Sequence, residues 1–136
     1  MIDSDPEKRR AGLEKMAEVY GWDEVADGDG DFFGYTVEHL FGEIWQRETL
    51  SMRDRRLLLL GLLVGHADHD VVPLQLGAAL GNGELGPDEL REVAVFLTHY
   101  AGWPSGARLN GQVEKVIADA AKAAARASET AAEEAP

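Results

Sequence analysis

Residues 52–65 read MRDRRLLLLGLLVG, and this stretch decides the fold class of the chain. Ser51 can cap a helix that starts here, and Asp54 stands in the position of a capping-box acid. Beyond Arg56 the predicted helix is apolar on nearly all sides. A helix that is apolar all round has to be buried all round, and in so small a chain this indicates packing against a second subunit. The apolar run is too short to span a bilayer.

Helical patterns continue on both sides of this stretch, with almost no strand signal. The first helix has Ser4 or Asp5 as its cap and Gly21 as its stop. In the fifth, Phe96 and Tyr100 are expected to face inward together with leucines and valines. The predicted helices cover residues 6–20, 33–46, 52–65, 71–80 and 87–100, and a sixth carries Leu109, Val113, Val116 and Ile117 on one stripe. The prediction is an all-α fold of about six helices in a compact bundle.

Three segments are expected along the chain. Residues 1–31 form an N-terminal helix and an acidic loop, and residues 32–118 form the helical core. Residues 119–136 form an Ala-rich acidic tail with no large apolar residue, which predicts partial disorder.

Composition excludes several function classes. The net charge is −12 over 136 residues, so neither nucleic acid nor a membrane surface is an expected partner. The chain has no cysteine, which excludes disulfides, thiolate metal sites and cysteine chemistry. The start, MIDSDPEKRR, lacks an apolar signal-peptide core, so a cytoplasmic location is expected. No cofactor is indicated.

The stretch GHADHD at residues 65–70 places two histidines and two aspartates at the junction of two predicted helices. Asp70 is a good N-cap for the helix that follows it. His66 and His69 with the two carboxylates could bind zinc or iron, although the spacing matches no specific metal motif. A loop with a cap and a metal site are therefore both open at this point.

Three blocks of sequence resemble the carboxymuconolactone decarboxylase-like family. They lie within FGEIWQRETLSMRDRRLLLLGLLV (41–64), LQLGAALGNGELGPDELREVAVFLTHYAGWP (74–104) and the following ARLNGQVEKVI. The resemblance implies an all-α protein, usually a trimer or hexamer, with pockets at subunit contacts. The residues that carry it are Trp45, Arg47, Leu50, Ser51, Arg53 and Arg55, then Ala79, Leu80, Gly83, Glu89, Leu90, Glu92 and Val93, and finally Tyr100, Ala101, Gly102 and Pro104.

The family has two chemical branches, and the resemblance implies which of them applies. The alkylhydroperoxidase-like branch uses a C-x-x-C pair, which would fall at Asp68 and Val71. Its histidine would fall at Gln75 and its glutamate at Arg56. All four are absent, so thiol peroxidase activity is excluded. The other branch decarboxylates an unsaturated lactone acid in the catabolism of aromatic compounds.

Decarboxylation leaves a dienolate, so the site has to bind a carboxylate, stabilise an oxyanion and supply a proton. The resemblance implies Arg47, Arg53 and Arg55 for the carboxylate, because a guanidinium makes bidentate pairs with it. The alternative for this cluster is a solvated, ion-paired helix start. The remaining predicted binding residues are Trp45, Tyr100 and Trp103.

The proton donor is the open question, because Gln75 can donate a hydrogen bond but cannot exchange a proton. His99 is the expected substitute, with His39, His66 and His69 as further histidines. The predicted catalytic residues are therefore His99, Gln75 and Glu43, although Glu43 could simply pair with Arg47 one turn away.

Three functions stay open on the sequence. The first is an enzyme, most simply a carboxy-lyase acting on a small carboxylate or lactone. The second is a non-catalytic ligand-binding or scaffold protein of the same fold, and the third is a metal enzyme that uses GHADHD.

Overall fold

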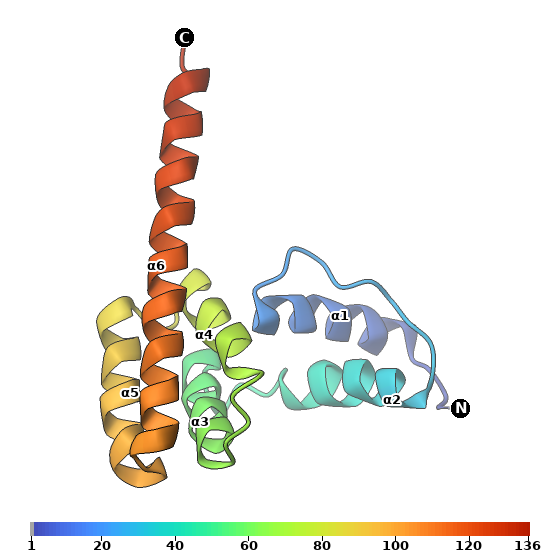
Figure 1. The fold of residues 1–136 in the computed structure, drawn as a ribbon. Helices are drawn as coiled ribbons and strands as arrows, with labels where there is room; N and C mark the ends of the chain where they lie inside the picture. Colours follow the sequence, from blue (N-terminus) through green and yellow to red (C-terminus); the bar gives the residue numbers. More distant parts are fainter. Residues whose placement is uncertain (1) are drawn as a thin grey trace. The chain divides into compact units, whose positions relative to one another are not determined.

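The structure is a computed structural model that describes residues 2–136. These residues form six α-helices and one π-helix, with no strand among them, which confirms the predicted all-α class. Figure 1 shows the path of the chain. The chain divides into two compact units between Arg55 and Arg56, within the first turns of α3 (Met52–Gly65). The segment boundaries expected at residues 31 and 118 stay a prediction.

The N-terminal unit consists of α1 (Pro6–Tyr20), α2 (Asp31–Gly34) and η1 (Tyr35–Ile44). As predicted, Asp5 caps α1, where its carboxylate accepts the backbone N–H groups of the first turn. In Figure 1, α1 runs alongside the helix formed by α2 and η1. A Cβ atom at Gly12 would lie 2.0 Å from the Val37 carbonyl oxygen, so only glycine allows this close contact of α1 with η1.

One continuous helix over residues 33–46 was expected, and this prediction is wrong in detail. A short α2 leads into η1, a π-helix, and the Trp45 N–H donates to the Leu40 carbonyl at 2.9 Å. A π-helix is wider than an α-helix, and its hydrogen bonds join residues five apart. Such segments are rare and frequently occur at functional sites.

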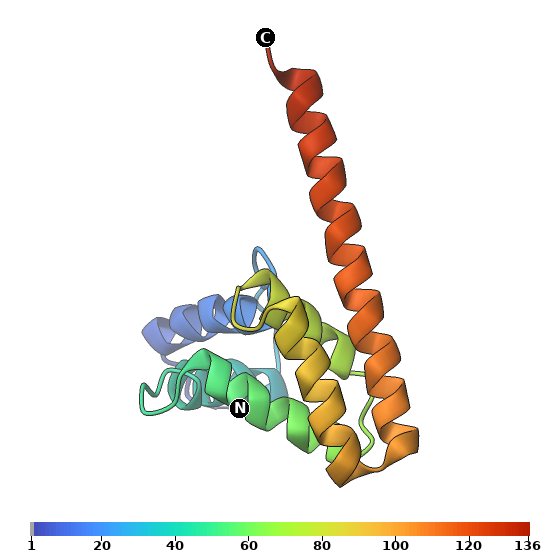
Figure 2. The same ribbon diagram turned by 90° about the vertical axis from the view of Figure 1, so that its left-hand side faces the viewer.

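The C-terminal unit contains most of α3 together with α4 (Val72–Gly81), α5 (Pro87–Ala101) and α6 (Trp103–Glu134). α6 packs against α4 and α5 (Figures 1 and 2). The predicted stripe on α6 is confirmed, since Leu109 and Val113 are fully buried. The buried core of the unit consists of Leu60, Val64, Val72, Leu76, Ala79, Leu85, Leu90, Ala94, Leu109 and Val113.

The structure corrects the predicted buried face of α5. The buried face of α5 is made by Leu90, Ala94 and Thr98, so Phe96 and Tyr100 are 59% and 81% exposed instead of facing inward. The small side chains of α5 face α6, and this allows the two helices to approach closely.

Asp70 does not act as the predicted cap. α4 begins at Val72 with no side-chain cap, and Asp70 contacts Arg108 on α6 at 3.4 Å. The predicted cap is wrong because Val71 occupies the capping position and its own backbone is already helical.

α6 extends well past the other helices of its unit (Figure 2). Every residue from Ala118 onward is exposed, and the helix continues to Glu134. The high helix propensity of alanine accounts for a helix without packing partners in the chain. Partial disorder of this tail stays a prediction. No helix among residues 2–136 is long and apolar enough to cross a membrane.

Candidate functional site

Gln75, one of the predicted catalytic residues, belongs to a buried polar cluster. The Arg56 guanidinium is fully buried and donates through Nη1 to Gln75 Oε1. Its Nε and Nη2 donate to the two carboxylate oxygens of Glu84, at 2.7 and 3.1 Å. The Asn82 amide also donates to Glu84, at 3.3 Å. Sequence reasoning missed Glu84, because only the fold brings the turn after α4 beside α3.

The hydrogen bonds within this cluster limit what the side chains of Arg56 and Gln75 can bind. The charge of Arg56 is balanced by Glu84 in a bidentate ion pair, so this guanidinium is not available to a substrate carboxylate. The carbonyl oxygen of Gln75 is taken up by Arg56, which leaves its amide NH₂ as a hydrogen-bond donor. Positions 56 and 75 therefore meet in space, in a cluster whose one carboxylate, that of Glu84, is paired with the Arg56 guanidinium.

His69 is also buried, and no local pattern in the sequence predicts its burial. Its Nε2 lies 2.8 Å from the Ser105 hydroxyl, and its Nδ1 lies 3.4 Å from the Gln112 side-chain oxygen. Gln112 donates back to the His69 carbonyl at 2.8 Å, and Ser105 donates to the Val64 carbonyl. These bonds tie the α3–α4 turn to α6.

No group of three or more His, Cys, Asp or Glu side chains in residues 2–136 is arranged to hold a metal ion. The side chain of His66, the other histidine of the GHADHD stretch, is exposed, whereas that of His69 is buried. The two histidines of this turn therefore have different surroundings.

The predicted arginines lie on the surface where η1 ends and α3 begins. Arg47 and Arg53 are exposed, and Arg55 is half-buried. Arg55 Nη2 donates to the Arg47 carbonyl at 2.9 Å, which holds the two backbone segments together. Trp45 is half-buried and stacks on Phe41, with ring centroids 6.2 Å apart.

Three further predicted residues come together at the α5–α6 corner. The rings of His99 and Trp103 lie 6.0 Å apart, and Tyr100 packs beside Phe96 at 5.3 Å. His99 Nδ1 lies 2.7 Å from the Val95 carbonyl, so this nitrogen carries the proton and donates it. These side chains form an exposed aromatic patch, defined here as Val95, Phe96, His99, Tyr100 and Trp103.

Glu43 lies in a pocket of the N-terminal unit. One carboxylate oxygen accepts from Lys8 Nζ at 2.6 Å, and the other lies 2.9 Å from His39 Nδ1. The suggested pairing of Glu43 with Arg47 is therefore not the one found. Lys8 and then His39 hold the pKa of the Glu43 carboxyl below its usual range. The pocket has a volume of about 450 Å³ and is lined by Ile2, Asp3, Asp5, Lys8, Tyr35, Glu38, His39 and Glu43.

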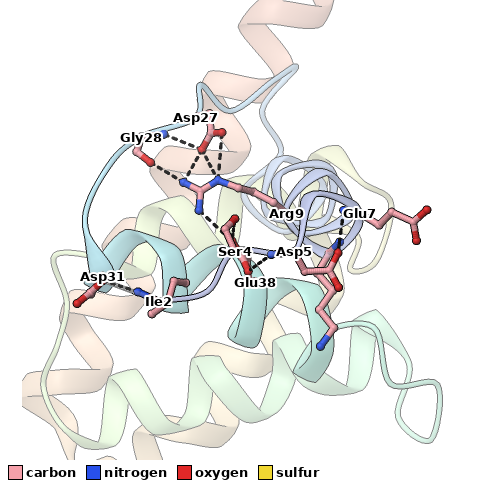
Figure 3. Close-up of polar contacts among 10 residues, drawn as sticks. Ile2, Ser4, Asp5, Glu7, Arg9, Asp27, Gly28, Asp31 and Glu38 are labelled. Carbon is pink, nitrogen blue, oxygen red and sulfur yellow. Dashed lines mark hydrogen bonds and ion pairs between the residues drawn. The ribbon is translucent and has the colours of Figure 1, made fainter.

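Arg9 lines a second pocket of the N-terminal unit and joins several of its segments (Figure 3). It donates to Asp27 at 2.8 Å, to Glu38 at 3.0 Å and to the Gly28 carbonyl. Glu38 also accepts from the Ser4 hydroxyl at 2.6 Å and from the Asp5 N–H at 3.0 Å. The start of the chain, α1, the acidic loop and η1 therefore meet around one guanidinium.

The same contacts predict how the N-terminal unit responds to acid. Arg9 lowers the pKa of the Asp27 carboxyl, and the Ser4 hydroxyl, the Asp5 N–H and Arg9 lower that of Glu38. A carboxyl with a lowered folded-state pKa contributes stability above its unfolded pKa of about 4, and loses it as the pH falls through the folded value. We therefore expect the N-terminal unit to loosen below about pH 4.

The measurement is the urea midpoint between pH 2 and pH 6, followed by tryptophan fluorescence. Arg9→Gln should reduce the fall of the urea midpoint on acidification relative to wild type. Arg10→Gln, which removes an exposed partner of Glu14 on the same helix, should leave the fall of the midpoint on acidification unchanged. Equal pH slopes in wild type and Arg9→Gln would contradict the assignment.

Comparison with known proteins shows the family of this chain. A model of the carboxymuconolactone decarboxylase family matches residues 30–109, and the chain belongs to this family. It is 28% identical over 123 residues to 4-carboxymuconolactone decarboxylase of Acinetobacter baylyi, covering 85% of this chain and 91% of that protein. It is 34% identical over 85 residues to the nitrosuccinic acid decarboxylase npaB of Metarhizium robertsii, covering 61% of this chain and 57% of that protein. No solved structure gives a significant match.

Proposed function

We propose that this protein is a carboxy-lyase that acts on a small carboxylated or enolisable acid of the lactone type. The observation that carries the proposal is the alignment with a decarboxylase along 91% of that protein's length. The second relative is also a decarboxylase by name. A thiol peroxidase function does not fit, because the sequence contains no cysteine. A cytoplasmic setting and a part in the catabolism of aromatic compounds belong to the same proposal.

The proposed chemistry is acid–base and electrostatic. Loss of CO₂ leaves an electron pair that is delocalised as an enolate, and the site has to stabilise it and then protonate carbon. In the N-terminal unit, Arg47, Arg53 and Arg55 are proposed to bind the substrate carboxylate, with Trp45 beside them. The surface exposure of Arg47 and Arg53 supports this role, because their guanidinium groups are accessible from solvent.

In the C-terminal unit, Gln75 is proposed to donate its amide N–H groups to an oxyanion. The exposed aromatic patch offers the Trp103 indole N–H, the Tyr100 ring and the His99 imidazole. Because His99 donates through Nδ1, its Nε2 is the nitrogen that can accept or release a proton.

We also propose that the chain assembles as a trimer or hexamer. The exposed aromatic patch and the exposed Leu58 and Leu62 of α3 support this, because isolated monomers rarely expose so many large apolar side chains together. The mass of the particle in solution tests this proposal, since it should be three or six times 14.8 kDa.

One observation favours a second function. Arg56 and Glu84 hold Gln75 in a cluster whose one carboxylate, that of Glu84, is engaged in a bidentate ion pair with the Arg56 guanidinium. A non-catalytic protein that binds the same small acids would need the arginines but no proton donor.

The test is CO₂ release from 4-carboxymuconolactone and from nitrosuccinate by the purified protein. Arg47→Ala and Arg53→Ala should each lower kcat/KM roughly 100-fold, the effect of removing one preorganised donor to a charged group. Arg126→Ala, which removes the same charge from the exposed tail, is the control. Binding of either acid without CO₂ release would favour the non-catalytic function. If the protein neither binds these acids nor releases CO₂ from them, the proposal is contradicted.

A further inference from the structure

The pocket beside Glu43 contains a histidine that differs from the other three. Among the histidines of residues 2–136, His39 is the one whose ring is hydrogen-bonded to a carboxylate, with Nδ1 2.9 Å from Glu43 Oε2. His69 is bonded to a hydroxyl and an amide, and His99 to a backbone carbonyl. Because an ionised carboxylate only accepts, Nδ1 of His39 carries a proton and donates it.

The other nitrogen of the ring is available. Nε2 of His39 has no hydrogen-bond partner among the described residues, and the side chain is 61% exposed at the lining of the 450 Å³ pocket. The ring is thus fixed at one nitrogen and open at the other. This is the arrangement by which a carboxylate orients a histidine for proton transfer.

Lys8 fixes the carboxylate in turn. Its Nζ lies 2.6 Å from Glu43 Oε1, so Glu43 bridges an ammonium and an imidazole. Lys8 is on α1, one turn before Gly12, where α1 lies closest to η1. α1 lies outside residues 30–109, the segment that matches the family. The N-terminal helix therefore adds a residue of its own to a cluster on η1.

We propose that His39 delivers the proton to carbon in the decarboxylation, with Glu43 and Lys8 as positioning residues. This inference rests on the proposed carboxy-lyase function and names its acid. Both His39 and His99 offer Nε2, but His39 lines a pocket, and its Nδ1–H is oriented by the charged Glu43 carboxylate. His99 is paired with a neutral carbonyl.

The step balances within the pocket. The bond between the substrate carbon and its carboxylate breaks, CO₂ leaves, and the electron pair stays on the substrate as an enolate or nitronate. The proton on Nε2 of the His39 imidazolium then passes to that carbon. The ring is left neutral, with its remaining proton on Nδ1 still donated to Glu43, and solvent restores the proton on Nε2.

Most of the carboxylates that line the pocket already accept hydrogen bonds from other groups of the protein. Glu38 accepts three hydrogen bonds from Ser4, Asp5 and Arg9, and the Asp5 carboxylate caps α1. The charged and titratable groups around the His39 ring are Asp3, Asp5, Lys8, Tyr35, Glu38 and Glu43.

The test compares kcat against pH for the full-length wild type and four variants. His39→Gln should lower kcat about 100-fold or more and abolish the fall in rate at high pH that reports loss of the acid. Lys8→Met should lower kcat and leave KM unchanged, because the Glu43 carboxylate then loses the ammonium that holds it in place beside the ring. Arg10→Met, from the exposed pair Arg10–Glu14 on the same helix, should match wild type.

A second measurement does not depend on turnover. Long-range ¹H–¹⁵N spectra of the wild type should show neutral His39 with its proton on Nδ1, which is the less common tautomer of histidine in water. A neutral His39 protonated on Nε2 would overturn the inference.

The outcomes separate the two proposals. Activity that survives in His39→Gln but is lost in His99→Gln overturns the role of His39 and leaves the carboxy-lyase function standing. No CO₂ release by the wild type from either 4-carboxymuconolactone or nitrosuccinate overturns the proposed function, and the inference with it.

Discussion

Replacing Arg56 with alanine is expected to lower the free energy of unfolding by about 3–5 kcal/mol. The substitution leaves the Glu84 carboxylate, whose side chain is only 7% exposed, without its bidentate partner. It also frees the Gln75 carbonyl oxygen inside the unit. A buried charge without a partner is much less stable than a buried ion pair, and this difference sets the size of the effect.

Urea denaturation followed by circular dichroism measures this loss. The matched control is Arg91→Ala, which breaks the bidentate pair with Glu114 on the surface, where both side chains are nearly half exposed. That variant should unfold close to wild type, because water replaces the lost partner. Equal losses in the two variants would show that burial of Arg56 does not carry the stability of this cluster.

The second large effect is expected at Gly106 on α6. A Cβ atom there would lie 2.0 Å from the Thr98 hydroxyl oxygen and 2.6 Å from its Cβ. Thr98 is buried, and its hydroxyl donates to the Ala94 carbonyl at 2.6 Å, so it has little freedom to move. Gly106→Ala should therefore force α5 and α6 apart, at a cost of about 1–3 kcal/mol or more.

Gly111 supplies the matched control one and a half turns further along the same helix. A Cβ atom at Gly111 meets nothing within 4 Å. Gly111→Ala should stabilise the protein by about 0.5–1 kcal/mol, because alanine has the higher helix propensity. The same substitution is therefore expected to change the free energy of unfolding in opposite directions at two positions of one helix. The urea midpoints of the two variants measure these changes. A stabilising Gly106→Ala would contradict the close contact of α5 and α6.

The helices themselves could be predicted from local patterns. Asp5, Pro6 and Gly21 fixed both ends of α1, and the spacing of Leu109 and Val113 gave the buried stripe of α6. The family could be recognised from motifs that lie along the chain, and its match over residues 30–109 confirms it. Such signals need no knowledge of which segments meet, because they act within one helix or are read in linear order.

The orientation of the side chains was harder to predict. Tyr100 was expected to face inward because it shares a helical stripe with Leu90 and Leu97, yet it is 81% exposed. The face of α5 that packs was chosen by its neighbour, since Ala94 and Thr98 allow Gly106 of α6 to come close. An apolar stripe gives the period of a helix but not the face that a partner covers.

The sequence by itself determined the all-α class, the ends of α1 and α3 and the absence of cysteine chemistry, because each depends on local propensity or on composition. Only the tertiary structure decided the partners of the polar residues. Arg56 meets Glu84 across 28 positions and Lys8 meets Glu43 across 35. Such pairs leave no trace in periodicity or spacing, since an ion pair needs only that two side chains end within hydrogen-bond distance, and the fold alone brings them there.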